Sequence, residues 1–207
     1  MANQVFPTKG NLIAAKKSLT LARTGFDLLD RKRNILIREM MGLIDAAGAL
    51  QSRIDITFSQ AYEALQIAEI MHGNCRDLAE NTPVDESVQI RFRSVMGVEI
   101  PLVTASEKPP AAPYGFASAG IDFDEAVQRF NRVKLLIREL AEVETSIYRL
   151  ATAVKKTQKR ANALQNVIIP DLTGKVKFIV ASLEEKEREE FVRMKVIKAR
   201  SVSSSGR

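Results

Sequence analysis

Apolar and small residues recur at alternating steps of three and four along the first third of this 207-residue chain. This spacing keeps them on one narrow face of an α-helix, and about eight such heptads are typical of a helix that pairs with another in a coiled coil. At about 1.5 Å per residue, the helix would be about 90 Å long. The seam comprises Leu12, Ala15, Leu19, Ala22, Phe26, Leu29, Leu36, Met40, Leu43, Ala47, Leu50, Ile54, Ala61, Leu65 and Ala68.

Two polar residues, Arg33 and Thr57, take positions in the same seam. Polar seam residues usually fix the register of a coiled coil at some cost in stability. We expect Arg33 to meet a carboxylate or to extend its aliphatic stem toward the surface. It belongs to a charged collar whose basic members are Arg31, Lys32 and Arg33.

A second seam begins after residue 121, where Asp122 and Glu125 have the spacing of a capping box. Pro170 is expected to end or kink this helix, because proline lacks an amide donor and clashes with the preceding turn. The seam reads Phe123, Ala126, Phe130, Val133, Ile137, Leu140, Glu144, Ile147, Leu150, Val154, Thr157, Ala161, Leu164 and Ile168. A further helical stretch is expected through Val176, Ile179, Leu183, Phe191, Met194 and Ile197.

Two long seams in one chain predict a mainly α fold, a long antiparallel two-helix coiled coil with both termini at the same end. Between them, alternating residues around a Met96-Gly97 turn predict a short β-hairpin, followed by a loop rich in Pro, Ala and Gly. An isolated hairpin is marginally stable, so it should pack on the helices or on a partner, as a small cap opposite the termini. The expected parts are 1–72 (first long helix), 73–121 (cap with hairpin and loop), 122–200 (second long helix) and 201–207 (disordered tail).

Motifs for catalysis are missing from the sequence. It has no GxxxxGK[ST] phosphate loop, no GxGxxG after a strand, and a single histidine, His72, which makes a metal cluster or a His-dependent triad improbable. Cys75 has no CxxC partner, and we interpret both residues as structural. We therefore expect a chain that is not an enzyme and that holds no cofactor or metal.

The net charge of +6 is concentrated after residue 121. Such a surplus suits an acidic protein, nucleic acid or an anionic membrane surface. The basic clusters lack aromatic neighbours for base stacking, which favours a solvated or partner-facing surface over a nucleic-acid site. A cytoplasmic coiled-coil scaffold or nucleic-acid-binding rod remains the alternative at this point. The clusters are Lys155, Lys156, Lys159 and Arg160, then Lys195, Lys198 and Arg200.

The compartment is indicated by three features of the sequence. One cysteine allows no internal disulfide, and the first residues lack the layout of a signal peptide. No apolar run approaches the roughly 20 residues that span a bilayer. We expect a cytoplasmic chain without direct membrane insertion.

Two blocks resemble a known family. "FPTKGNLIAAKKSLTLARTGFDLLDRKRNILIREM", residues 6–40, resembles the N-terminal signature of the D subunit of V-type and archaeal-type rotary ATPases, and "RANALQNVIIPDLTGKVKFIVASLEEKEREEFVRMKVIKAR", residues 160–200, resembles its C-terminal signature. The order and spacing of the blocks fit the family, so the resemblance spans nearly the whole chain.

The resemblance implies a non-catalytic central rotor shaft, peripheral to the membrane through its complex. Its partners would be a hexameric ring of catalytic A and regulatory B subunits, the F subunit, and the C subunit on the membrane side, coupling ATP hydrolysis or synthesis to H⁺ or Na⁺ transport. Ring contacts are expected at Lys9, Lys16, Lys17, Arg31, Lys32, Arg33, Arg188, Glu189, Phe191, Arg193 and Met194. Cap contacts to the F subunit or to the membrane-side socket are expected at Ile90, Arg91, Phe92, Arg93, Val98 and Ile100.

Overall fold

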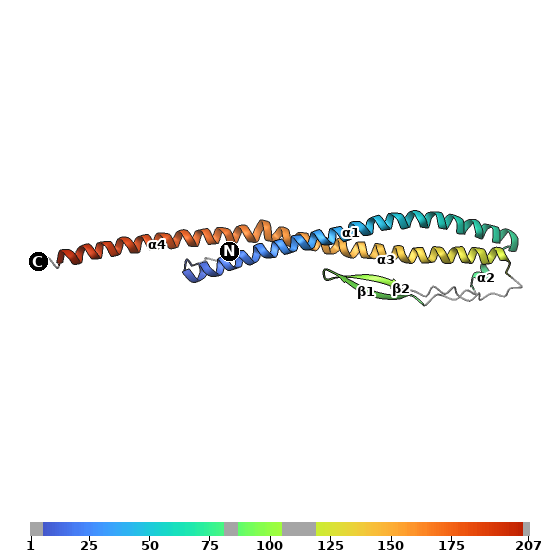
Figure 1. Ribbon diagram of the computed structural model, residues 1–207, viewed down its shortest axis with the longest axis horizontal. Helices are drawn as coiled ribbons and strands as arrows, with labels where there is room; N and C mark the ends of the chain where they lie inside the picture. Colours follow the sequence, from blue (N-terminus) through green and yellow to red (C-terminus); the bar gives the residue numbers. More distant parts are fainter. Residues whose placement is uncertain (1–5, 81–86, 105–118, 205–207) are drawn as a thin grey trace. The chain divides into compact units, whose positions relative to one another are not determined.

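A computed structural model describes residues 6–80, 87–104 and 119–204. It confirms a mainly α chain with one antiparallel β-hairpin (Figure 1). The chain divides into two compact units, which we call the terminal unit (Met1–Arg33 with Lys156–Arg207) and the central unit (Asn34–Lys155). The elements are α1 (Lys9–His72), α2 (Arg76–Glu80), β1 (Gln89–Val95), β2 (Val98–Thr104), α3 (Ile121–Ala163), the π-helix η1 (Leu164–Ile168) and α4 (Ile169–Ser204).

The predicted seam of α1 is confirmed. Every apolar position in it is buried or half-buried, from Leu12 in the terminal unit to Ala68 in the central unit. The α3 seam is confirmed except at Ile137 and Glu144, which are exposed. Leu136 and Val143, each one residue earlier, take the inner positions instead. Steps of three and of four still alternate along the inner face of α3, but in the opposite order from the predicted one.

The second helix was expected to stop or kink near Pro170, and it does not stop there. The chain continues from α3 through five π-helical residues into α4, and the Ile169 amide donates to the carbonyl of Leu164, five residues earlier. A π turn holds one more residue than an α turn, so everything downstream is rotated by one position. Ile168, expected in the seam, is exposed, whereas Ile169 is half-buried and Ile179 is fully buried.

The far end of the central unit is closed by a small apolar cluster. Gly73, with φ of 76°, ends α1, and its amide donates to the carbonyl of Glu69. The side chain of Asn74 then accepts from the amide of Arg76 and caps α2, a five-residue helix that the sequence patterns did not predict. Cys75 is buried there with Ala64, Ala68, Phe123 and Ala126.

The β-hairpin is confirmed, but not its expected position. Met96 and Gly97 have positive φ angles of 49° and 74°, as a two-residue type I′ turn requires. Ile100 of β2 is buried against Leu36 of α1 and Leu150 of α3, far along the helices from the α1 end at His72. The hairpin therefore lies along the helix pair of the central unit and does not cap its end (Figure 1). Residues 105–118 of the expected loop lie outside the described residues.

In the terminal unit, the start of α1 lies against α4. The Lys9 ammonium is 3.2 Å from the Glu187 carboxylate. Beyond this pair α4 continues to Ser204, and residues 184–199 are all exposed. Residues 201–204 are thus helical, in contrast to the expected disordered tail, and 205–207 lie outside the described residues.

Candidate partner-binding surfaces

The basic collar has two kinds of member. Arg33 is half-buried in the seam, where its guanidinium lies 2.6 Å from the Asp30 carboxylate and donates to the side-chain oxygen of Gln158 at 2.8 Å. This confirms that Arg33 meets a carboxylate, and it means that its charge is engaged within the chain. Arg31 is exposed and Lys32 is half-buried. Among the three, Arg31 is the group best placed to contact another molecule.

A second basic surface lies near the start of α1. Lys16 and Lys17 are exposed and line a shallow groove with Ile13 and Leu21, whose side chains are 66% and 75% exposed. The two lysines were predicted from the sequence as contacts, but the apolar pair was not. A signal for the pair was available, because Ile13 and Leu21 are apolar residues outside the seam.

The exposed end of α4 carries the remaining predicted ring contacts. Arg188, Glu189 and Arg193 are exposed, and Phe191 and Met194 are 64% and 62% exposed. Ile197 continues the row at 61%. Steps of three place Phe191, Met194 and Ile197 along one side of the helix. The seam pattern of α4 thus runs on beyond the part of α1 that could cover it.

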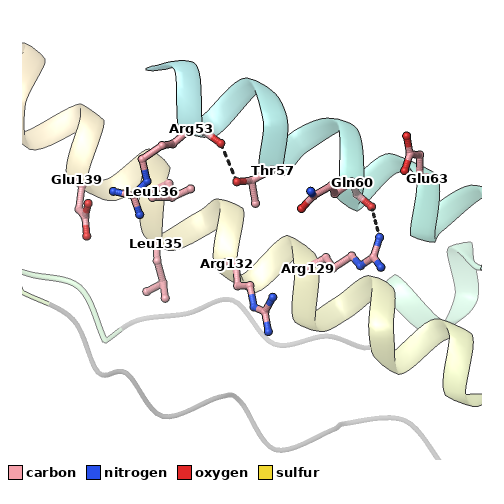
Figure 2. Close-up of a pocket in the computed structure, with 9 residues that line it drawn as sticks. All are labelled: Arg53, Thr57, Gln60, Glu63, Arg129, Arg132, Leu135, Leu136 and Glu139. Carbon is pink, nitrogen blue, oxygen red and sulfur yellow. Dashed lines mark hydrogen bonds between the residues drawn. The ribbon is translucent and has the colours of Figure 1, made fainter. Parts of the chain in front are cut away.

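The central unit has a groove between α1 and α3 (Figure 2). The Arg129 guanidinium crosses from α3 to donate to the carbonyl of Gln60 on α1, at 2.8 Å. The seam residue Thr57 donates to the carbonyl of Arg53, so its hydroxyl is satisfied within its own helix. The groove is lined by Arg53, Thr57, Gln60, Glu63, Arg129, Arg132, Leu135, Leu136 and Glu139.

The hairpin is fastened to α3 along one edge. The amide of Val103 donates to the Glu142 carboxylate at 2.7 Å, and the Arg149 guanidinium donates to the carbonyl of Glu99 at 3.1 Å. Arg149 also lies over the ring of Phe92, 5.4 Å from its centroid. The spacing of seven residues between Glu142 and Arg149 puts both on one side of α3, a signal that the sequence predictions did not use.

The predicted hairpin contacts separate into two groups. Ile90, Arg91, Phe92 and Arg93 on β1 are exposed and open to a partner. On β2, Val98 is half-buried and Ile100 is 3% exposed, because both pack on the helices. Ile100 is therefore an internal anchor, and its prediction as a contact to another protein is not supported by its burial.

Among the described residues, no helix combines the length and apolar character needed to cross a bilayer.

Comparisons with known proteins agree with these observations. The family model described as the D subunit of ATP synthase matches residues 11–199. The D subunit of a V-type ATP synthase from Thermotoga neapolitana is 43% identical over 196 residues, 94% of this chain and 97% of the relative. The D subunits of A-type ATP synthases from Pyrococcus furiosus and Thermococcus kodakarensis are 36% and 37% identical over 201 and 207 residues, covering 95% and 98% of this chain and 94% and 97% of the relatives. By the family match and by these nearly full-length relatives, the chain belongs to the D-subunit family of ATP synthases.

Proposed function

We propose that this chain is the non-catalytic central shaft of a rotary ATPase, turning inside a ring of A and B subunits. The observation that carries the proposal is α1, one uninterrupted helix of 64 residues whose seam is apolar along its length except at Arg33 and Thr57. A rotor must transmit torque, and a helix whose backbone hydrogen bonds run unbroken resists bending better than segments joined by loops.

The exposed end of α4 supports insertion of the terminal unit into the ring. Phe191, Met194 and Ile197 each expose more than three-fifths of their surface on one side of the helix. Contiguous exposed apolar residues usually mark an interface with another protein. Lys9, Lys16, Lys17, Arg31, Arg188 and Arg193 would add charged contacts with the inner wall of the ring, with Lys32, Arg33 and Glu189 lying nearby.

The central unit would carry the remaining partners. We assign the groove between α1 and α3 to the F subunit, since it offers three arginine side chains together with Leu135 and Leu136. The end of the central unit at which α1 ends and α3 begins would face the C subunit. At this end, Ile70, Met71 and Ile121 are 81%, 67% and 85% exposed. Both assignments use surfaces that the described residues leave open.

The mechanism follows from asymmetry. A rod without threefold symmetry contacts three catalytic interfaces unequally, so each interface takes a different conformation and nucleotide affinity. Rotation exchanges those states in turn, and coupled rotation drives H⁺ or Na⁺ transport, or ATP synthesis in the reverse direction. The ion and the direction would be set by other subunits and by the ion gradient.

The test is native mass spectrometry of the chain mixed with the A, B and F subunits of its source and nucleotide. One copy of this chain with one F on three A and three B is expected. The variant Phe191→Ser/Met194→Ser/Ile197→Ser should fold normally but leave the ring. Tyr148→Ser, which changes a side chain 74% exposed in the central unit, is the matched control. A ring that always excludes the folded wild-type chain, or that retains the triple variant as firmly as the control, would contradict the proposal.

A further inference from the structure

The two outer edges of the hairpin differ in whether their backbone groups have hydrogen-bond partners. The register pairs Ile90 with Val103, Phe92 with Pro101 and Ser94 with Glu99. The Val103 amide and the Glu99 carbonyl point away from β1, because both are bonded to side chains of α3. Pro101, between them, has no amide to offer. The outer edge of β2 is therefore closed by α3 and by a proline.

The outer edge of β1 follows from the same register. Residues paired across an antiparallel ladder alternate between bonded and non-bonded pairs, and both members of a non-bonded pair point outward. Since Val103 and Glu99 point outward, so do the amides and carbonyls of Ile90, Phe92 and Ser94. None of the three has a hydrogen-bond partner among the described residues at these backbone groups. The side chains of Ile90 and Phe92 are 60% and 58% exposed.

An open edge strand with exposed apolar side chains is a template for another strand. A second copy of β1 is a poor candidate for that strand. If two copies paired antiparallel about Phe92, Arg91 of each would lie opposite Arg93 of the other, and like charges directly across a pair are destabilising. A strand with carboxylates opposite Arg91 and Arg93 would instead form two favourable cross-strand pairs.

We propose that β1 extends its sheet by one strand, donated by another protein of the ATP synthase complex, in which acidic residues alternate with apolar ones. The carboxylates would face Arg91 and Arg93, and the apolar residues would cover Ile90 and Phe92. Backbone bonds to Ile90, Phe92 and Ser94 would provide the affinity. This inference rests on the family membership and not on the proposed shaft role.

Amide hydrogen exchange resolved to single residues tests the proposal. In the isolated chain, the amides of Arg91 and Arg93 should be protected by β2, whereas those of Ile90, Phe92 and Ser94 should exchange fast. In the purified complex, the three outward amides should slow by at least about tenfold, giving protection at every residue of β1. Outward amides that stay fast in an intact, rotating complex would overturn the strand addition and leave the shaft proposal standing.

A proline at position 92 separates the backbone from the side chain. Pro101 shows that this hairpin accepts proline at the outward position directly across from Phe92. Phe92→Pro removes the outward amide, whereas Phe92→Val keeps it, and both lose the ring that Arg149 covers. Protection of Ile90 and Ser94 in the complex should disappear with proline and persist with valine. Equal protection in the two variants would refute the proposal. Protection of Arg91 in the isolated variants would show that the hairpin is folded.

The identity of the donated strand can be captured chemically. In the variant Arg91→Lys/Arg93→Lys the charge remains, and a carbodiimide joins lysine to a carboxylate in direct contact. A cross-link to an Asp or Glu of another protein of the complex is expected, flanked by apolar residues at alternate positions. A cross-link to a second copy of this chain, or protection of the outward amides that grows with the concentration of the chain alone, would show self-pairing and overturn the proposal.

Discussion

The π-helix gives the sharpest test of the packing in the terminal unit. Alternating steps of three and four from Leu164 reach positions 168, 171, 175, 178 and 182, yet the residues found on the inner side lie one place later. Ile169, Leu172 and Val176 are half-buried, and Ile179 is 0% exposed. The chain thus contains one residue too many for a continuous seam, and η1 absorbs it.

Removing that residue should convert η1 to α-helix without disturbing the seam. We choose Val167, which is 65% exposed, for deletion. Pro170 is changed to alanine in all variants, because proline inside a regular α-helix costs about 3 kcal/mol. The free energy of unfolding of the deletion variant should stay within about 1 kcal/mol of that of Pro170→Ala alone, since every inner residue keeps its place.

Deletion of Lys177 in the same Pro170→Ala background is the matched control. Lys177 is exposed and lies in regular α-helix, where no extra residue is available to absorb a deletion. Its removal would therefore rotate the rest of α4 by about 100° around the helix axis. Ile179 would leave the interior at a cost of about 1.5–3 kcal/mol, and half-buried Leu183 would add to the loss. Urea unfolding followed by circular dichroism at 222 nm measures both variants. Equal destabilisation by the two deletions would refute the reasoning.

Four further predictions concern other residues. Glu142→Ala should speed exchange of the Val103 amide by an amount equivalent to about 1–3 kcal/mol, and Glu142→Gln by less, because glutamine keeps an acceptor. Arg33→Gln should lower thermal stability, because the bonds of Arg33 to Asp30 and Gln158 are lost. Arg31→Gln should leave thermal stability unchanged and weaken ring assembly. The reverse pattern in thermal melting and native mass spectrometry would contradict the view that Arg33 acts within the chain and Arg31 acts on a partner. Leu150→Ala should cost about 2–5 kcal/mol in unfolding experiments, since Leu150 is fully buried, and Leu28→Ala, at a residue 61% exposed, should cost much less. Burial, and to a smaller extent the negative charge of Glu69, raises the pKa of the Cys75 thiol. Iodoacetamide should therefore label Cys75 more slowly than a free thiol at pH 8. Because the folded pKa lies above the unfolded value of 9.0, the contribution of the thiol to folding stability should be full below pH 9 and be lost as pH rises through the folded pKa.

The helices could be predicted from the sequence because their signal repeats. Fifteen apolar positions in α1 point the same way, so one exception such as Arg33 does not obscure the seam. The π-helix could not be predicted by the proline rule, which says that the α-helical bond is lost but not what replaces it. The step of eight from Ile168 to Val176 did signal a shift of register. The bond from the Ile169 amide to the Leu164 carbonyl and the burial of Ile179 show that the shift occurs within a continuous helix.

The hairpin shows the limit for tertiary position. Alternation and the Met96-Gly97 turn were enough to predict both strands, because these are local properties. Its position depends on Ile100 meeting Leu36 and Leu150, which are 64 and 50 residues away in sequence, and no local pattern encodes that contact. Glu142 and Arg149 were not singled out from the sequence for the same reason. Their hydrogen bonds to the backbone of β2 can be recognised only once the structure places β2 beside α3.

The surfaces of the terminal unit bear on how a shaft could distinguish three catalytic interfaces. On α1, Lys16, Lys17 and Arg31 have no ion-pair partner among the described residues, so this helix presents uncompensated positive charge. On α4, acidic and basic residues are interleaved before an exposed apolar row, and Glu187 already pairs with Lys9. The charge of α1 therefore adds long-range attraction to carboxylates to the apolar contacts of Ile13 and Leu21, while α4 offers mainly short-range apolar contact. If the ring surrounds both helices, equivalent walls of the ring meet different side chains at each rotor angle. This is the inequality that sequential exchange of catalytic states requires.

Raised salt should then weaken contacts made by α1 more than those made by α4. Measured with the Arg31→Gln and Phe191→Ser variants at low and high salt, the salt dependence of ring binding should fall only with the first. An equal fall with both would remove this source of asymmetry.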